Sequence, residues 1–255
     1  MIDRRSFTTG LTALGALAAT KAVSATTPPR VHNVVLVHGA YADGSCWAEV
    51  IPHLQARRLN VTAVQNPLNS LAEDCDYTRR AIALQDGPTV LVAHSYGGEV
   101  ITETGVDPKV SALVYCAARA PDAGEDYTAL AKGFPAPPAS LGLVHSGGYA
   151  RLSEAAFLRD FAGDIDPVKA RILYAVQGPI SDTLFNARVT QAAWRSKPSF
   201  YQVSTNDRTI DPDLERFMAK RMGAKTIELP ASHLAILSHP REIAALILEA
   251  AGYPV

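Results

Sequence analysis

The sequence predicts an α/β protein with a mostly parallel, doubly wound sheet of about six strands and a helical cap insertion. Two observations predict this class. Apolar runs alternate with helical patterns over residues 26–120 and 199–255, which form the predicted core, and this alternation stops over 121–198, the predicted cap. The 255 residues are 47% hydrophobic and 19% charged, which is typical of a globular chain with a substantial core.

Four strands are predicted ahead of the cap, and the continuous apolar runs at 33–37 and 89–93 favour strands buried on both faces. The four strands cover residues 33–37, 61–64, 89–93 and 110–116. Helical spacing between them predicts helices over residues 46–57, 72–84 and 99–104. Strands separated by helices indicate parallel pairing through right-handed crossovers.

Proline and glycine clusters interrupt the predicted cap, where no strand is expected. Its helical patches lie near residues 153–161, 167–176 and 182–194. The alternation then resumes, with strands predicted at 200–204 and 226–229 and helices at 213–222 and 241–251. A helical insertion in such a sheet typically covers a site at the carboxyl ends of the strands.

The first 25 residues resemble a bacterial export signal. Arg4 and Arg5 form a twin-arginine pair, a weakly apolar stretch covers residues 10–19, and Val23-Ser24-Ala25 is typical of a cleavage site. An ordinary N-terminal helix and a general secretory signal are the alternatives. We therefore expect a periplasmic or secreted protein, and no stable membrane insertion, because no apolar run is long enough to span a bilayer.

Composition and cysteine spacing exclude several classes of protein. The 24 Lys and Arg residues nearly balance 25 Asp and Glu residues, which argues against a nucleic-acid partner. Cys46, Cys75 and Cys116 form no C-x-x-C motif and no ligand spacing with the histidines, so neither a disulfide framework nor a metal site is predicted. No nucleotide motif appears, and no cofactor is expected. The pairing of the cysteines and the oligomeric state stay open.

The run from Ala93 to Gly98, Ala-His-Ser-Tyr-Gly-Gly, directly follows a predicted strand and opens a predicted helix. This is the context of a nucleophile elbow, whose tight turn needs small residues two positions before and two positions after the nucleophile. Ala93 and Gly97 meet that requirement, so Ser95 is the predicted nucleophile. A similar stretch, His-Ser-Gly-Gly at 145–148, follows no predicted strand and is rejected as an elbow.

A serine hydroxyl needs a general base, which follows the acid in the chain order serine, acid, histidine. His233 lies in the loop after the last predicted strand and is the preferred base, ahead of His239. Asp207 follows the strand at 200–204 and is preferred as the acid over Asp122, which follows the strand at 110–116.

An ester carbonyl that is attacked becomes an oxyanion, which needs prearranged N–H groups. The expected donors are the backbone N–H groups of Tyr96 and of Ala40, with Gly39 allowing close approach of the backbone. The predicted substrate-binding residues are Gly39, Tyr41, His94, Phe134, Phe157 and Trp194. Tyr127, Leu158, Tyr174 and Phe185 are further cap candidates, and together these side chains indicate an apolar acyl or alcohol pocket.

At these motifs the chain resembles the α/β-hydrolase superfamily, in the small-capped branch of plant methylesterases, hydroxynitrile lyases and bacterial serine esterases. The resemblance covers about residues 32–252 and rests on the motifs at 35–40, 92–98, 206–210 and 232–240. It implies Ser95 as nucleophile, His233 as base, Asp207 as its partner, and Ala40 and Tyr96 as oxyanion donors. It also implies a serine esterase acting on a small-molecule ester.

Other activities of the same fold stay open as alternatives. Hydroxynitrile lyases of this branch carry Thr and Lys where this chain has Gly39 and Leu234, so a cyanide leaving group would lack its cationic stabiliser. Cofactor-free perhydrolysis uses the same triad, and a non-catalytic small-ligand receptor is a further class. Ser95 excludes the carboxylate nucleophile of haloalkane dehalogenases and epoxide hydrolases. Neither the ester nor a preference for amides or lactones is predicted.

Overall fold

The computed structural model describes Met1 and residues 30–254, so the predicted export signal lies outside the described residues. The main sheet has six parallel strands in the order β2-β1-β3-β4-β8-β9, which confirms the predicted fold class. These strands are β1 (Asn33–Val37), β2 (Asn60–Ala63), β3 (Thr89–His94), β4 (Val110–Cys116), β8 (Ser199–Ser204) and β9 (Lys225–Leu229). Their boundaries lie within one residue of those predicted.

The centre of the sheet brings three strand ends to one edge. Every residue of β1 and β3 is buried, because helices cover a parallel sheet and leave no polar face. Val37 at the end of β1 pairs with Ala93, and His94 at the end of β3 pairs with Cys116 at the end of β4. Residues that follow these strands therefore emerge side by side.

Helices of the core pack on the sheet in two groups. They are α1 (Ile51–Gln55), α2 (Leu71–Ala83), α3 (Gly97–Thr104), α7 (Pro212–Met222), α8 (Ala235–Ser238) and α9 (Pro240–Ala250). Helices α2 and α3 contact each other and β1, whereas α1 contacts α9, which packs on β3, β4 and β8. The helix predicted over 46–57 is instead a short 3-10 turn, η1 (Gly44–Trp47), followed by α1. Proline at position 52 favours the start of a helix there, because its missing N–H costs nothing in a first turn.

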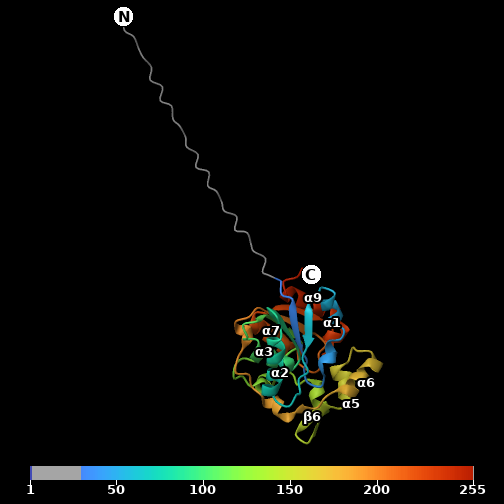
Figure 1. Ribbon diagram of the computed structural model, residues 1–255. Coiled ribbons are helices and arrows are strands. Elements are labelled where there is room, and N and C mark those ends of the chain that lie inside the picture. Colours follow the sequence, from blue (N-terminus) through green and yellow to red (C-terminus); the bar gives the residue numbers. More distant parts are fainter. Residues whose placement is uncertain (2–29, 255) are drawn as a thin grey trace.

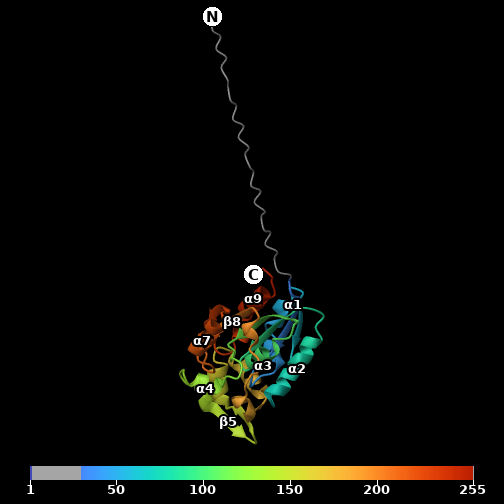
Figure 2. The same cartoon turned by 90° about the vertical axis from the view of Figure 1, so that its left-hand side faces the viewer.

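The cap segment contains strands that the sequence pattern did not indicate. Its elements are α4 (Tyr127–Ala131), η2 (Pro138–Gly142), β5 (Leu143–Ser146), β6 (Tyr149–Leu152), α5 (Glu154–Ala156), η3 (Phe157–Phe161), α6 (Pro167–Val176), β7 (Ile180–Ser181), η4 (Asp182–Asn186) and η5 (Ala193–Arg195). Strands β5, β6 and β7 form an antiparallel sheet, so the expectation of no strand is wrong. Figures 1 and 2 place the cap at the end of the molecule opposite the C-terminus.

Two predicted helices of the cap are broken up, while α6 forms as predicted. The patch at 153–161 becomes one turn of α5 and the π-type turn η3. The patch at 182–194 forms only the 3-10 turns η4 and η5. Between these turns the backbone N–H groups of Thr190 and Gln191 donate to the Glu103 carboxylate, and this contact replaces the bonds of a helix.

The stretch at 145–148 is the end of β5 and the hairpin turn that leads into β6, not a strand-to-helix elbow. Gly147 and Gly148 have φ values of 60° and 82°, a conformation that suits the tight turn of an antiparallel hairpin. The cysteines are three free, buried thiols. Among the described helices, none has both the length and the apolar character needed to cross a membrane.

Candidate active site

Ser95 occupies the turn between β3 and α3. Its φ of 56° lies in the left-handed region, which non-glycine residues rarely adopt and which is frequent at functional turns. The backbone of the segment after β4 holds this turn, because Ser95 N–H donates to the Cys116 carbonyl and the Arg119 N–H donates to the Ser95 carbonyl, at 3.3 and 3.0 Å. The tight turn predicted for the Ala93–Gly98 run is therefore present, and Ser95 lines a cavity.

Glycines allow three chain segments to meet at this turn. A Cβ atom on Gly39 would lie 2.5 Å from Ser95 Cβ and 2.8 Å from the His94 carbonyl oxygen. A Cβ atom on Gly98 would lie 2.0 Å from the Arg119 carbonyl oxygen. Such separations are far inside van der Waals contact, so only glycine lets the loop after β1 lie against the serine.

His38 orients the peptide that precedes Ala40. Its Nε2 accepts a hydrogen bond from the Asn66 N–H at 2.9 Å, so Nδ1 carries the proton and donates to the Gly39 carbonyl at 2.8 Å. Burial lowers the pKa of His38 and keeps the ring neutral. Because C=O and N–H point in opposite directions in a trans peptide, this bond also sets the direction of the Ala40 N–H. Among the described residues, neither this N–H nor that of Tyr96 has a hydrogen-bond partner.

Asp207 and His233 lie together in the interior. Both side chains are fully buried, and His233 Nδ1 donates to Asp207 Oδ2 at 2.5 Å. Asp207 Oδ1 accepts from the backbone N–H groups of Thr209 and Ile210, at 2.6 and 3.0 Å, which hold the carboxylate in place. His233 Nε2 has no partner within the described part of the chain, and Ser95 Oγ is not hydrogen-bonded to it there. A proton on Nδ1 leaves Nε2 free to accept another.

His94 packs against His233 in the interior. Its Nε2 donates to the His233 carbonyl at 2.9 Å, and the two imidazole rings lie 4.6 Å apart. The side chain is completely buried, burial lowers its pKa well below the usual value, and it lines neither cavity described below. The structure does not place His94 in the lining of either cavity, where its predicted substrate-binding role would put it: the ring packs between the elbow and the loop of His233.

Two acidic residues of the cap, which sequence reasoning missed, join it to the loops of Asp207 and His233. Asp160 is completely buried and accepts from Arg208 Nε at 2.7 Å, and its carbonyl accepts from the Thr209 hydroxyl. Asp164 accepts from both the N–H and the hydroxyl of Ser232, next to the base. No pattern marks these carboxylates in advance, because acidic residues in a helical patch usually face water.

The cavity at Ser95 has a volume of about 230 Å³ and lies between the core and the cap. Ala40, the predicted oxyanion donor, and Ser95, the predicted nucleophile, both line it. Its lining is largely apolar and includes Tyr41, Tyr127, Ala131, Leu143, Leu152, Phe185, Ile210 and Leu214. The pattern also missed Arg119 in this lining. Its place in the chain could have indicated this, because Arg119 follows β4 by three residues, at the edge of the sheet where Ser95 emerges.

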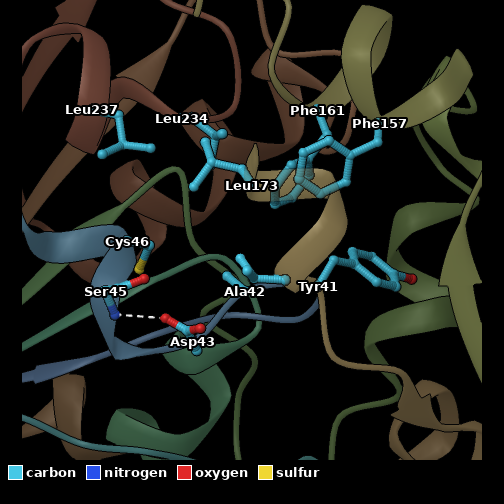
Figure 3. A pocket seen from close by; sticks show the side chains of 11 residues that line it. Tyr41, Ala42, Asp43, Ser45, Cys46, Phe157, Phe161, Leu173, Leu234 and Leu237 are labelled. Atoms are coloured by element: carbon cyan, nitrogen blue, oxygen red, sulfur yellow. Dashed lines mark hydrogen bonds between the residues drawn. The ribbon is translucent and has the colours of Figure 1, made fainter. Parts of the chain in front are cut away.

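A second, smaller cleft adjoins the first at Tyr41, which lines both. Figure 3 shows the rings of Phe157 and Phe161 beside each other and facing Leu234 and Leu237 from the far side of the cleft. The predicted substrate residue Phe157 therefore lines this cleft and not the cavity of Ser95. Burial raises the pKa of Tyr41 to about 12, so its hydroxyl stays protonated at neutral pH.

Phe134 and Trp194, two further predicted substrate-binding residues, line neither cavity. The Phe134 ring packs against Phe217 with centroids 5.8 Å apart, and Trp194 Nε1 donates to the Pro121 carbonyl at 2.9 Å. Guanidinium groups from Arg195 and Arg221 cover the indole. Both aromatic side chains therefore pack at the base of the cap, where Trp194 is buried and Phe134 is half-buried.

The alternative acid and base lie elsewhere in the structure. Asp122 forms an ion pair with Arg195 near the surface, and Arg195 lowers the pKa of that carboxyl. His239 Nδ1 contacts the Ser238 hydroxyl at 2.9 Å, directly ahead of α9. Neither residue shares a hydrogen bond with Ser95, Asp207 or His233 in the described residues.

A buried carboxyl group anchors the residue that follows the serine. The Tyr96 hydroxyl donates to Asp74 Oδ2 at 2.8 Å, and the Leu68 N–H donates to Oδ1 at 2.9 Å. Asp74 is completely buried, and burial raises its pKa from 3.8 to about 6. Between those values the folded protein holds the proton more tightly than the unfolded chain, so the free energy of unfolding falls as the pH rises.

Asp74→Asn is expected to remove this pH-dependent loss of stability. Asparagine can accept from Leu68 N–H and donate to the Tyr96 hydroxyl without ionising. The free energy of unfolding of the variant relative to the native protein should rise by about 1–3 kcal/mol between about pH 4 and about pH 8. Urea unfolding at several pH values measures it, with Asp76→Asn as control, because the Asp76 side chain is 64% exposed on the same helix. A difference that does not vary with pH would contradict the prediction.

Comparison with known proteins gives matches along nearly the whole described chain. A carbendazim-hydrolysing esterase from Nocardioides sp. is 27% identical over 242 residues, covering 83% of this chain and 96% of that enzyme. Putative methylesterase 19 from Arabidopsis thaliana is 27% identical over 255 residues, covering 85% of this chain and 96% of that protein.

Solved structures share the fold at lower identity. A pyrethroid hydrolase has a TM-score of 0.73 at 22% identity, with 86% of this chain and 96% of that chain covered. Polyneuridine aldehyde esterase has a TM-score of 0.72 at 21% identity, with 85% and 98% covered. The sequence profile described as alpha/beta hydrolase family matches residues 34–246. With this match spanning the sheet, the serine turn and the loop of His233, the chain belongs to the alpha/beta hydrolase family.

Proposed function

We propose that the protein hydrolyses small carboxylic esters through an acyl-enzyme on Ser95, with His233 as base and Asp207 as its partner. One observation carries the proposal: a serine with φ of 56° opens into an apolar-lined cavity beside a backbone N–H that is free and oriented by His38. A strained serine turn next to free N–H donors is suited to acyl transfer.

In the first half of the reaction, His233 Nε2 takes the proton of the Ser95 hydroxyl as the oxygen attacks the ester carbonyl carbon. The carbonyl π electrons move onto its oxygen, which the N–H groups of Ala40 and Tyr96 stabilise. Asp207 accepts from Nδ1 and stabilises the imidazolium. The intermediate collapses when the bond to the alcohol oxygen breaks and His233 donates its proton to that leaving oxygen.

In the second half, water replaces the alcohol. His233 Nε2 takes a proton from this water as its oxygen attacks the acyl carbon, and the same N–H groups hold the new oxyanion. The bond to Ser95 Oγ then breaks, His233 returns the proton to Oγ, and the carboxylic acid leaves. The cycle consumes one ester and one water and restores the enzyme without a cofactor.

Two features beyond the serine turn support this proposal. Relatives along nearly the whole chain are named as esterases or methylesterases. The cavity of about 230 Å³ suits a small ester, because ligand sites for drug-sized molecules are usually roughly 300–1,000 Å³. The apolar lining suits short alkyl or aryl groups on either side of the ester bond.

The test combines turnover with covalent labelling of the purified protein. p-Nitrophenyl esters with acyl chains of increasing length should be hydrolysed, and activity should fall once the chain exceeds the cavity. A fluorophosphonate should stop turnover, and peptide mass spectrometry should locate the label on Ser95, because such probes react with activated serines. A folded protein that hydrolyses none of these esters and carries no label on Ser95 would contradict the proposal.

A further inference from the structure

Among the described residues, Arg119 is the one basic residue in the lining of the Ser95 cavity. It lies three residues beyond β4, and its backbone N–H donates to the Ser95 carbonyl at 3.0 Å, so its position relative to the serine turn is fixed. Its side chain is only 21% exposed. A guanidinium group in an otherwise apolar cavity is costly to desolvate and needs a polar partner.

Neighbouring side chains pair with only part of the Arg119 guanidinium. Arg119 Nη1 donates to Glu99 Oε1 at 3.0 Å, and Cζ lies 4.5 Å from the centroid of the Tyr127 ring. Among the described residues, no other oxygen accepts a hydrogen bond from the guanidinium. Its remaining nitrogens have no partner there, and they are not sealed in the interior. Because a guanidinium has five N–H donors, Arg119 keeps donors for a molecule in the cavity.

The other charged groups at the cavity are already engaged. Asp211 accepts from the N–H groups of Asp213 and Leu214 and thereby caps α7. Glu99 is 2% exposed and lies behind Arg119, outside the cavity lining. The charged donors that line the cavity are therefore those of Arg119, held in place by Glu99 on one side and by the Tyr127 ring.

We propose that this cavity selects esters that carry a carboxylate, which the free N–H groups of Arg119 hold while Ser95 attacks the ester carbonyl. The inference rests on the proposed esterase function and names its substrate class. A carboxylate presents two oxygens to the planar fork of a guanidinium, a geometry that a lysine ammonium does not reproduce. Neutral esters of equal size would leave these donors without an acceptor.

The test compares matched acidic and neutral esters of nearly equal size. Monomethyl glutarate with methyl pentanoate places the charge on the acyl side, and 4-carboxyphenyl acetate with 4-methylphenyl acetate places it on the alcohol side. In at least one pair, kcat/KM should be roughly tenfold or more higher for the acid, because hydrogen bonds to charged groups are the stronger ones. Release of methanol or phenol gives the rates.

Two variants separate recognition from folding. Arg119→Lys keeps a cation beside Glu99 but loses the planar fork, and Arg119→Gln combined with Glu99→Gln avoids leaving a buried carboxylate unpaired. The double variant should lose roughly 10–100-fold in kcat/KM for the acidic ester, mainly through KM, with less than about threefold change for the neutral one. For the acidic ester, kcat/KM of Arg119→Lys should lie between the values of the native protein and of the double variant. The control removes the exposed pair of Arg188 and Asp126, as Arg188→Gln with Asp126→Asn, and should keep the native ratio.

The outcomes distinguish the inference from the function on which it rests. If neutral esters are hydrolysed and a fluorophosphonate labels Ser95, but the acid-to-neutral ratio of kcat/KM is near one or does not fall in either Arg119 variant, the inference is overturned and the esterase function stands. If neither class of ester is hydrolysed by the folded native protein, both are overturned. A native preference for the acid that disappears with Arg119 supports the inference.

Discussion

Ser95→Ala is expected to lower kcat for ester hydrolysis by about 10⁴–10⁶-fold, with KM nearly unchanged. The hydroxyl oxygen is the atom that would form the acyl-enzyme, and the other hydroxyl of the β3–α3 turn, that of Tyr96, is engaged by Asp74. Alanine has the same backbone strain as serine at φ of 56°, so the variant should fold like the native protein. Steady-state kinetics on a p-nitrophenyl ester, with a thermal melt alongside, measures both effects.

Ser146→Ala is the matched control for that experiment. Ser146 also follows a histidine, but it is the exposed last residue of β5, next to the hairpin turn, and lines neither the cavity of Ser95 nor the adjoining cleft. The control should keep native kcat. If Ser95→Ala retained a tenth or more of native kcat, an acyl-enzyme on Ser95 would be excluded.

Gly39→Ala has the second large effect: kcat should fall by about 10²–10³-fold, because removal of one oxyanion donor typically costs that much. The added Cβ would lie 2.5 Å from Ser95 Cβ, so the loop after β1 must move away from the serine. Ala40 belongs to the next peptide, and its N–H moves with the loop. The bond from His38 to the Gly39 carbonyl would be strained by the same movement.

The experiment on Gly39 separates the loss of the donor from loss of folding. Kinetics of Gly39→Ala are compared with Gly87→Ala, because a Cβ atom on Gly87 would meet only Asn33 Nδ2 at an ordinary 3.7 Å. The far-ultraviolet circular dichroism of both variants should match the native protein, while only Gly39→Ala loses kcat. Native kcat in Gly39→Ala would show that the position of the Ala40 N–H does not matter for the reaction.

The boundaries of the central sheet strands could be predicted from the sequence because burial on both faces selects apolar runs. β1, β3 and β4 are such runs, and each lies where its pattern indicated. The cap strands β5 to β7 escaped prediction for the opposite reason. They have two to four residues each, which is too short for a period to emerge, and their pairing depends on the Gly147–Gly148 turn.

The candidate site also has one part that could be predicted from the sequence and one part that could not. Ser95 could be predicted because a tight strand-to-helix turn demands small residues at fixed offsets, a requirement local to the chain. The lining of the cavity could not, since Phe134 and Trp194 carry the same aromatic signal as Tyr41 and Phe185 but pack the base of the cap. Which aromatic side chain faces a cavity depends on how the cap packs on the core.

By itself, the sequence determined the parallel sheet, the serine turn and the order of serine, acid and histidine, because these follow from local periodicity and from residues at fixed spacing. Only the tertiary structure decided that Asp207 lies against His233, that Asp160 and Asp164 join the cap to their loops, and that Arg119 turns toward the cavity. The physical reason is sequence separation. These contacts join residues that are far apart in the chain and come together only once the sheet and the cap have packed.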